Sequence, residues 1–370
     1  MTDTREAAQT APPTIYDVAR AAGVSIASVS RVLNGRRNPR EETRERVLQA
    51  VAELGFVPDG AARALSGRIK EVVGVVIRRV RWVPTSEGGF AEEDESLIFT
   101  DVINRGIEVA AQRQDFNLLL SSVDVDDHDV SRRLLALARK SDGLILHDRV
   151  LEPDELDQLS RRVPVVTLAN VATSTTTNVH SDNEAGMRGL ARHLLADHGY
   201  RTLAYVAGLG DSPDSVARGE TLAAEAAEAG ATLLTGARWQ GNYYAAGGAR
   251  VIERLIADGV ALPRAIACAN DQTALGVMYA LAQHGIDVPG DVAVAGFDDI
   301  PMARHLRPQL TTVRQPIQEI GATAFDVLHS MISSGAPAEH DVVLPTRLIL
   351  RESCGCPSPA PAAPPLRPGV

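Results

Sequence analysis

Short apolar runs alternate with amphipathic helical patterns along most of the chain, between Val72 and Leu350. This alternation is typical of βαβ units, in which helices join buried parallel strands. Proline or glycine stands at many of the boundaries, as reversals of the chain require. The pattern predicts strands at Val72–Ile77, Phe116–Ser121, Gly143–His147, Pro164–Leu168, Thr202–Ala207, Ala265–Ala269 and Val292–Phe297. These runs are far shorter than the roughly 20 apolar residues that a membrane-spanning helix needs, so we expect no membrane partner.

The first seventy residues carry helical periods instead. A first helix is predicted from Thr14, opened by a capping box with Asp17 and closed by a turn at Gly23. Ser25 can cap a second helix, and a third covers Glu41 to Leu54. The side chains that these helices are expected to bury are Ile15, Val18, Ala19, Ala22, Val29, Val32, Leu33, Val47, Val51 and Leu54. The pattern predicts a small all-α module of three helices.

Two helices joined by a short glycine-containing turn form the arrangement in which the second helix enters the DNA major groove. On the second helix, Ile26, Ala27 and Arg31 remain on the outer side. Arg31 can read guanine, and the two apolar side chains can contact thymine methyl groups. A plain helical hairpin is the alternative interpretation.

Charge is distributed unevenly along the 370 residues. The whole chain has a net charge of −10, but residues 1 to 70 carry 11 Lys and Arg against 8 Asp and Glu, a net charge of +3, which leaves −13 on the rest. A basic module on an acidic body is expected when only the module approaches a polyanion. An excess of this size also arises by chance.

The same residues carry a resemblance to a known family. The segment TIYDVARAAGVSIASVSRVLNG, followed by TRERVLQAVAELGFVP, resembles the head of the lactose-repressor (LacI/GalR) family, and DGAARALSG resembles its hinge helix. A looser resemblance continues to RESCGC near the end of the chain. It implies a small all-α helix-turn-helix head plus an α/β periplasmic-binding-protein-like body of two Rossmann-like lobes, which three chain crossings join.

Matching positions imply the DNA contacts. Base contacts are implied for Ile26, Ala27 and Arg31, and phosphate contacts are implied for Thr14, Tyr16, Ser25, Ser28, Ser30, Asn34 and Thr43. The chain departs from the family at Arg40, where a Ser usually caps the third helix. Leu65, in the hinge candidate 59–67, would enter the minor groove, with ordinary packing as its alternative. So short a helix should form only when it is paired and docked on DNA.

Candidate ligand residues follow the predicted strands of the body, where the carboxyl ends of parallel strands border a cleft. A guanidinium group with carboxylates and an amide suits the vicinal hydroxyls of a sugar. Together with the resemblance, this indicates Arg218, Tyr243, Asn270, Asp271, Asp298 and Gln315. For Asp271 and Asp299, a helix N-cap is the alternative. The segment Arg78 to Leu97 replaces a shorter family loop and either covers the cleft or is a solvated insertion.

The sequence lacks the signatures of catalysis. His180, Ser181 and Asp182 are merely consecutive, and no dinucleotide or phosphate-binding loop is complete, so we expect no enzyme activity, no catalytic residue and no cofactor. Cys354 and Cys356 could supply half of a zinc site. The scattered histidines are interpreted as surface or hydrogen-bonded residues, which leaves no second pair at ligand spacing, so no metal is expected and both cysteines are assigned to the tail.

We therefore expect a cytoplasmic transcriptional regulator, favoured to be a repressor, that binds a near-palindromic operator as a homodimer and responds to a small molecule, for which a sugar is favoured. A corepressor-dependent regulator and a solute-binding transport protein are the alternatives. The expected organisation is a disordered start at 1–13, a helix-turn-helix domain at 14–58, a hinge at 59–70, a two-lobed domain at 71–356 and a disordered tail at 357–370.

Overall fold

The computed structural model describes residues 13–33, 40–56, 69–79, 97–124, 129–170, 173–335 and 339–357. The chain divides into two compact units, Met1–Lys70 and Glu71–Val370. The first unit is called the head here and the second the body.

The head contains the three predicted helices, α1 (Ile15–Ala22), α2 (Ile26–Leu33) and α3 (Glu41–Leu54). Gly23 ends α1 in the left-handed conformation with a φ of 62°, which a glycine adopts without strain. The capping box and the N-cap are confirmed as well. The Asp17 carboxylate accepts the Thr14 backbone N–H at 2.9 Å, and the Ser25 hydroxyl oxygen accepts the Ser28 N–H at 3.2 Å. The buried core comprises Val18, Ala19, Ala22, Val29, Val47, Ala50 and Phe56.

One core prediction for the head is wrong. Leu54 is 37% exposed, because α3 ends there and Gly55 turns the chain away in a left-handed conformation. Phe56 closes the core in its place and is buried.

Lobe 1 of the body is built on a six-stranded sheet. Its strands run in the order β11, β5, β4, β3, β1, β2, and every neighbouring pair is parallel. The bounds are β1 Val72–Arg79, β2 Asn117–Asp124, β3 Gly143–Leu146, β4 Val165–Leu168, β5 Thr177–Ser181 and β11 Asp341–Leu344. Helices α5 (Leu97–Gln112) and α12 (Ile317–Ser334) bury one core with the sheet, whereas α6 (Val130–Ala138) and α7 (Pro153–Ser160) bury another.

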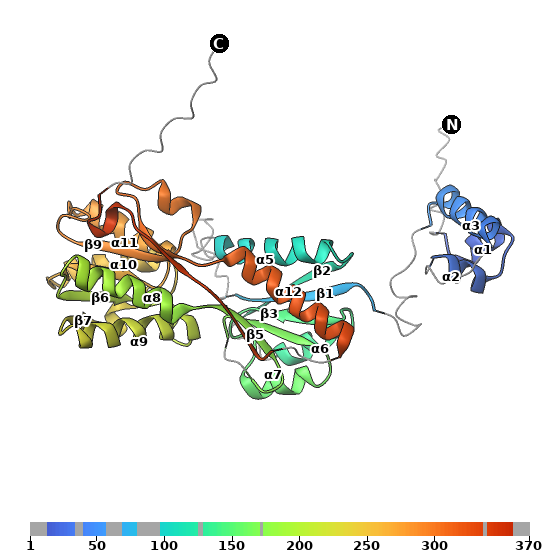
Figure 1. The fold of residues 1–370 in the computed structure, drawn as a ribbon, viewed down its shortest axis with the longest axis horizontal. Coiled ribbons are helices and arrows are strands. Elements are labelled where there is room, and N and C mark those ends of the chain that lie inside the picture. The colour runs from blue at the N-terminus through green and yellow to red at the C-terminus, as the bar shows by residue number, and fades with distance from the viewer. Residues whose placement is uncertain are drawn as a thin grey trace, which may run out of the picture. The chain divides into compact units, whose positions relative to one another are not determined.

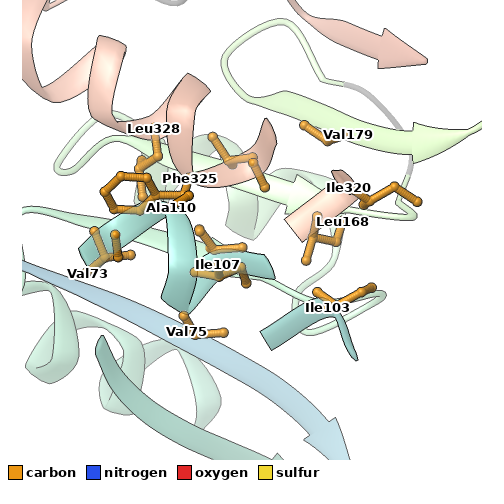
Figure 2. Close-up of a cluster of buried hydrophobic side chains, with 14 of the residues drawn as sticks. Val73, Val75, Ile103, Ile107, Ala110, Leu168, Val179, Ile320, Phe325 and Leu328 are labelled. Carbon is orange, nitrogen blue, oxygen red and sulfur yellow. The ribbon is translucent and has the colours of Figure 1, made fainter. Parts of the chain in front are cut away.

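Figure 2 shows the first of these cores, where Ile107 of α5 and Phe325 of α12 lie among valines of β1. The two helices approach closely because each has a glycine at the contact. A Cβ atom on Gly106 would lie 2.0 Å from the backbone oxygen of Gln318, and one on Gly321 would lie 2.1 Å from that of Ile103.

Lobe 2 repeats the architecture with strands in the order β12, β10, β9, β8, β6, β7, of which only the pair β12 and β10 is antiparallel. The bounds are β6 Thr202–Val206, β7 Thr232–Leu234, β8 Ala265–Cys268, β9 Ala293–Asp298, β10 Thr311–Arg314 and β12 Arg347–Ile349. Its helices are α8 (Asn183–Arg192), α9 (Pro213–Glu228), α10 (Ala245–Ala257) and α11 (Asp271–Gln283). A π-helical turn, η2 (His193–Asp197), extends α8, and the 3-10 turns are η3 (Ala237–Trp239), η4 (Pro301–Arg304) and η5 (Glu352–Cys354).

The chain passes between the lobes three times, after β5, after β10 and after β11 (Figure 1). All seven predicted strands are confirmed, and no boundary differs by more than three residues. The sequence did not predict β5, β7, β10, β11 or β12. Among the described residues, the helices lack the length and apolar character needed to cross a membrane.

Candidate functional site

The outer side of α2 carries the residues predicted to contact bases. Ile26 is 41% exposed, and Ala27 and Arg31 are exposed beside it. The Arg31 Nε donates to the Ala27 backbone oxygen at 3.2 Å, which holds the guanidinium along the helix surface. Thr14, Tyr16 and Ser25 are also exposed, while Ser28, Ser30 and Thr43 are half-buried. Asn34, Leu65 and the hinge candidate 59–67 lie outside the described residues.

The start of α2 suits an anion. Its first N–H groups point out of the helix, as they do at the phosphate sites of many proteins. The hydroxyl groups of Ser25 and Ser28 lie 2.9 Å apart at this end. The third helix begins after Arg40, whose side chain makes no capping hydrogen bond, as the departure from the family pattern predicted.

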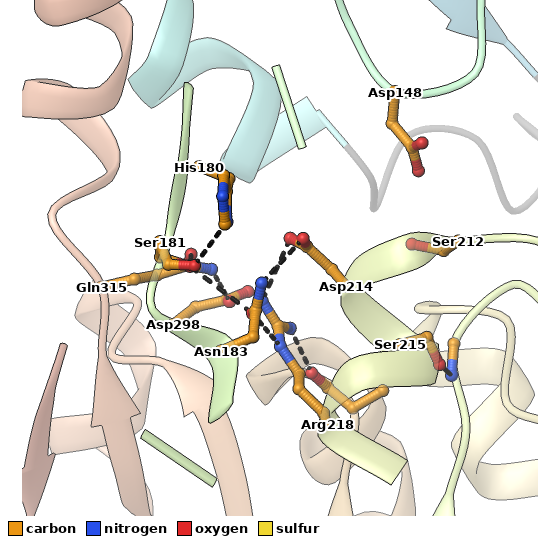
Figure 3. A network of polar contacts seen from close by, with 12 residues as sticks. Asp148, His180, Ser181, Asn183, Ser212, Asp214, Ser215, Arg218, Asp298 and Gln315 are labelled. Carbon is orange, nitrogen blue, oxygen red and sulfur yellow. Dashed lines mark hydrogen bonds and ion pairs between the residues drawn. The ribbon is translucent and has the colours of Figure 1, made fainter. Parts of the chain in front are cut away.

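In the body, a buried network surrounds Arg218 on α9 (Figure 3). Its Nε donates to the Asn183 side-chain oxygen at 2.8 Å, one terminal nitrogen donates to the Ala269 backbone oxygen at 2.7 Å, and the other contacts Asp214 at 3.3 Å. The guanidinium carbon lies 3.7 Å from the centre of the Phe297 ring. Because every nitrogen has a partner, the charged group is held rigidly at the carboxyl ends of the lobe 2 strands.

Residues of two crossings between the lobes, those after β5 and after β10, belong to the same network. The Ser181 hydroxyl, at the end of β5, donates to Gln315 Oε1 at 2.8 Å, and the Gln315 amide donates to Asp298. Asn183 follows Ser181 and donates to Asp214 at 2.8 Å. Burial raises the pKa of the Asp298 carboxyl to about 7, although the charge of Arg218 lowers it. The structure thus brings together Arg218, Asp298 and Gln315, as the sequence predicted.

Lobe 1 contributes residues that the sequence did not single out as site residues. Asp148 and Arg149 follow β3, and Asp148 faces Ser212 and Asp214 of lobe 2 (Figure 3). Burial raises the pKa of Asp148 to about 7, while Arg149 lowers it. Arg149 also forms an ion pair with Asp211 of lobe 2.

Arg78, at the end of β1, contacts the same Asp211 at 3.3 Å, so two cations of lobe 1 share one carboxylate of lobe 2. Their positions at the end of β1 and on the loops after β3 and β6 were the available signal, because ligands bind at the carboxyl ends of such strands. The segment predicted to border the site is otherwise outside the described residues, which exclude 80–96.

Tyr243 is held against lobe 2. Its hydroxyl lies 2.8 Å from the Ser212 hydroxyl, and its ring covers Gly208, where a Cβ atom would lie 2.2 Å from the ring. Asn270 supports this position because its amide donates to the Tyr243 backbone oxygen at 3.1 Å, while its oxygen caps α11 through the Thr273 N–H. Both polar ends of Asn270 are therefore engaged inside the lobe.

The N-cap interpretation is wrong for Asp271 and Asp299. Asn270 caps α11 instead, and Asp271 is fully buried, accepting from the Ile300 N–H at 2.9 Å and from the Thr312 hydroxyl at 2.5 Å. Burial raises its pKa well above the ordinary value. Asp299 pairs with Arg314 and Arg351 at 2.6 and 2.5 Å. Both carboxylates stabilise the packing of lobe 2.

Two sequence predictions are also wrong: that both cysteines belong to the tail, and that the histidines are scattered. Cys354 is not part of a loose tail, because it is fully buried in the core of lobe 2. His193 and His198 do not lie apart from the cysteines, because the fold brings all four side chains together. The H-x4-H spacing of the two histidines was the sequence signal, since zinc sites commonly use three to five residues between histidines.

The chain matches the family model described as bacterial regulatory proteins, lacI family, over residues 14–59, and the periplasmic binding protein-like domain over residues 191–354. It is 32% identical over 345 residues to catabolite control protein A of Priestia megaterium, a match that covers 92% of this chain and 98% of the relative. The chain belongs to the lacI family of bacterial regulatory proteins. The ribose operon repressor of Haemophilus influenzae is 30% identical, with the same coverage of both chains.

Solved structures of similar fold agree with this assignment. A crystal structure of the lac repressor dimer bound to operator and the anti-inducer ONPF has a TM-score of 0.79 at 26% identity and covers 93% of this chain and 99% of that one. The complex of the transcriptional regulator CelR with cellobiose has a TM-score of 0.64 at 28% identity, with 92% and 99% covered. The predicted fold class is confirmed, and this lacI-family chain is a DNA-binding transcriptional regulator.

Proposed function

We propose that this regulator is a cytoplasmic repressor, that it binds a near-palindromic operator as a homodimer, and that a sugar bound between the two lobes changes its affinity for DNA. The relatives support the first part, since one is named a ribose operon repressor and one structure holds a repressor dimer on its operator. The functional units would be a helix-turn-helix domain at 14–58, a hinge at 59–70 and a two-lobed domain at 71–356.

The network around Arg218 carries the effector proposal. It joins lobe 2 to the crossings after β5 and β10 through Asn183, Ser181 and Gln315. A ligand that contacts these side chains would therefore touch the segments that bend when one lobe moves against the other. Such a ligand shifts the population of lobe arrangements in proportion to its preference for one of them.

The charges favour a neutral polyhydroxylated ligand. Asp148, Asp211, Asp214 and Asp298 face Arg78, Arg149 and Arg218, and Arg78 and Arg149 already share Asp211. Because the pKa values of Asp148 and Asp298 are about 7, the charges of these seven groups nearly cancel at neutral pH, which leaves no unpaired cation for an anionic ligand. Carboxyl groups and amides still offer hydrogen bonds to hydroxyl groups. The sites therefore suit a sugar better than a sugar phosphate or a carboxylate.

In the head, Ile26, Ala27 and Arg31 would read bases, and the exposed hydroxyls around the α2 start would position the phosphates. Leu65 would enter the minor groove from the paired hinge helices. DNA binding and sugar binding would then be coupled through the segment that leads from the head to β1.

The proposal is tested with the purified full-length protein. Duplexes enriched from a random pool should contain an inverted repeat, and their affinity should decrease steeply with salt. A thermal-shift screen should then find a neutral sugar that stabilises the protein. That sugar should change operator affinity: a decrease identifies an inducer, and an increase identifies a corepressor. A sugar that binds without any effect on DNA binding would favour the solute-binding alternative. Failure to enrich any inverted repeat would contradict the repressor.

The proposed insertion of Leu65 into the minor groove gives a separate prediction. Leu65→Ala should weaken operator binding by about tenfold or more, because the alanine side chain cannot unstack a base step, and it should leave sugar affinity unchanged. Fluorescence anisotropy of a labelled operator measures the first and isothermal titration the second. Equal operator affinity in variant and wild type would refute the insertion of Leu65 into the minor groove.

A further inference from the structure

Two histidines and two cysteines converge in lobe 2, away from the network around Arg218. The ligand atoms of His193, His198, Cys354 and Cys356 all lie within 4.8 Å of one another. The histidines belong to the turn after α8, and the cysteines to the end of the segment after β12. Asn183, in the Arg218 network, stands at the other end of α8, about 15 Å along the helix axis from His193.

The distances fit one tetrahedral ion. The Nε2 atoms of His193 and His198 lie 3.0 Å apart, and His193 Nε2 lies 3.4 Å from the Sγ atoms of both Cys354 and Cys356. The Cys356 Sγ lies 3.5 Å from His198 Nε2. Around a tetrahedral zinc ion with ordinary bond lengths, two nitrogens lie about 3.4 Å apart and a nitrogen and a sulfur about 3.6 Å apart. The remaining two pairs, each with Cys354 Sγ, lie within 4.8 Å, so shifts of up to about 1 Å would complete the coordination.

The local backbone explains how the histidines meet. On a regular α-helix, residues five apart point about 140° away from each other. Here the helix changes to the π-helical turn η2, in which the His198 N–H bonds to the His193 backbone oxygen at 3.2 Å. This wider turn brings the first and sixth residues to the same side, and single π-turns occur frequently at functional sites.

The cysteine pair depends on a glycine. Gly355, between the two cysteines, has a φ of 99°, a conformation that other residues rarely adopt. A Cβ atom there would also lie 3.0 Å from the Tyr200 hydroxyl and 3.3 Å from the His198 ring. Tyr200 fixes the turn by donating to the Cys354 backbone oxygen at 2.9 Å, and its ring stacks on His198.

Neighbouring groups orient the ligand atoms as they do around known metal ions. The His193 Nδ1 lies 2.8 Å from an Asp197 carboxylate oxygen, an arrangement that places the proton on Nδ1 and leaves the Nε2 lone pair for a metal. The Thr311 hydroxyl lies 3.0 Å from Cys354 Sγ.

We propose that His193, His198, Cys354 and Cys356 form a structural zinc site that fastens the C-terminal segment to the end of α8. Two thiolates and two imidazoles in a tetrahedron are the donor set typical of zinc. Four protein ligands leave no open position, so the ion would stabilise the lobe and not perform chemistry. Each zinc ion bound would displace the two thiol protons into solvent.

The test uses the full-length protein, reduced and freed of metal, with zinc or cobalt(II) ions as the only added probes. We expect one zinc per chain by elemental analysis after dialysis. Cobalt(II) should give the intense visible bands of a tetrahedral ion together with thiolate charge-transfer absorption. Removing zinc with a chelator should lower the melting temperature by on the order of 5 °C, and adding zinc back should restore it.

Matched variants localise the ion. Cys356→Ser and His198→Ala, which change half-buried ligands, should weaken zinc binding at least about 100-fold, and Asp197→Asn should weaken it about 10-fold to 100-fold with the tetrahedral cobalt spectrum retained. His284→Ala and Cys268→Ala remove a histidine and a thiol elsewhere in lobe 2 and should leave zinc content unchanged. Circular dichroism confirms that each variant is folded.

The proposal is overturned if the reduced wild-type protein holds less than one zinc per chain at micromolar zinc, if cobalt(II) gives the weak spectrum of an octahedral site, or if the double variant Cys356→Ser, His198→Ala retains wild-type affinity. The result does not depend on any sugar or operator.

Discussion

Asp298 is a residue at which burial opposes charge. Its carboxyl is 3% exposed, and burial raises its pKa from 3.8 to about 7, with Arg218 acting in the other direction. The folded protein therefore retains a proton that the unfolded chain has released between about pH 4 and pH 7. The stability contributed by this group is present below pH 4 and decreases as the pH rises to 7.

Asp298→Asn should remove this pH dependence at a small structural cost, because the Gln315 amide can still donate to the new side-chain oxygen. The melting temperature of the variant should decrease less than that of the wild type between pH 5 and pH 7.5. Differential scanning fluorimetry across that range measures the difference. Asp154→Asn, at an exposed carboxyl on α7, is the control. Parallel curves for Asp298→Asn and wild type would contradict the account.

The sequence predicted some members of this network and missed others for a physical reason. Arg218, Asp298 and Gln315 were found from strand ends and from the resemblance. Asn183 and Asp214 stand in the first turns of α8 and α9, where amides and acids are common as helix caps, so local sequence already explained them. Their roles depend on the hydrogen bonds from Asn183 to Asp214 and from Arg218 to Asn183, which join residues 31 and 35 positions apart in the sequence. Only the folded chain brings these residues together.

At the scale of elements, the contact between α5 and α12 determines how the second crossing enters lobe 1. α12 begins at Ile317, directly after Gln315 and Pro316. The position of α12 against α5 therefore also fixes Gln315, which donates to Asp298 in the network around Arg218. The two glycines permit backbone contact there, because any Cβ atom would overlap a backbone oxygen and not a flexible side chain.

Gly321→Ala should therefore separate the helices and lower the free energy of unfolding by about 1–3 kcal/mol, despite the better helix propensity of alanine. Gly189→Ala on α8 is a matched control, since nothing lies within 4 Å of its Cβ position, and it should be neutral or stabilising by up to about 1 kcal/mol. Urea denaturation measures both. Equal stability of the two variants would contradict the close-contact argument.

Element prediction succeeded where hydrophobicity was continuous and failed where it was not. The seven predicted strands contain short apolar runs, as buried parallel strands require, although the edge strand β2 is mostly half-buried or exposed. β5 reads TNVHS and β10 reads TTVR, and their buried polar side chains bond to partners far away in the sequence, such as Asp341 for Asn178 and Asp271 for Thr312. Strands of three to five such residues are set by their neighbours in the sheet, which the local sequence does not reveal.

At the scale of the whole body, the ion pairs around Asp211 join the two lobes. Arg78 and Arg149 come from lobe 1, whereas Asp211 lies 63% exposed on the loop after β6 in lobe 2. Exposed pairs contribute little to folding stability. These pairs are broken whenever the lobes separate, so they bias the equilibrium between lobe arrangements instead.

Asp211→Asn should lower sugar affinity by roughly 2-fold to 5-fold and leave the melting temperature nearly unchanged. The wild-type affinity should also depend more steeply on salt than that of the variant. Isothermal titration at two salt concentrations measures both effects. Glu108→Gln, which removes an exposed ion pair within α5 alone, is the control. The same loss of affinity in both variants would contradict a role for the inter-lobe pairs.

We propose that sugar binding between the lobes and DNA binding by the head are coupled, and coupling of binding free energies is reciprocal. The most direct measurement is the affinity of the full-length protein for its sugar, with and without saturating operator duplex, beside its affinity for operator with and without saturating sugar. We predict the same factor in both directions, within about 5-fold to 150-fold. A sugar affinity that is identical with and without operator would contradict the claim.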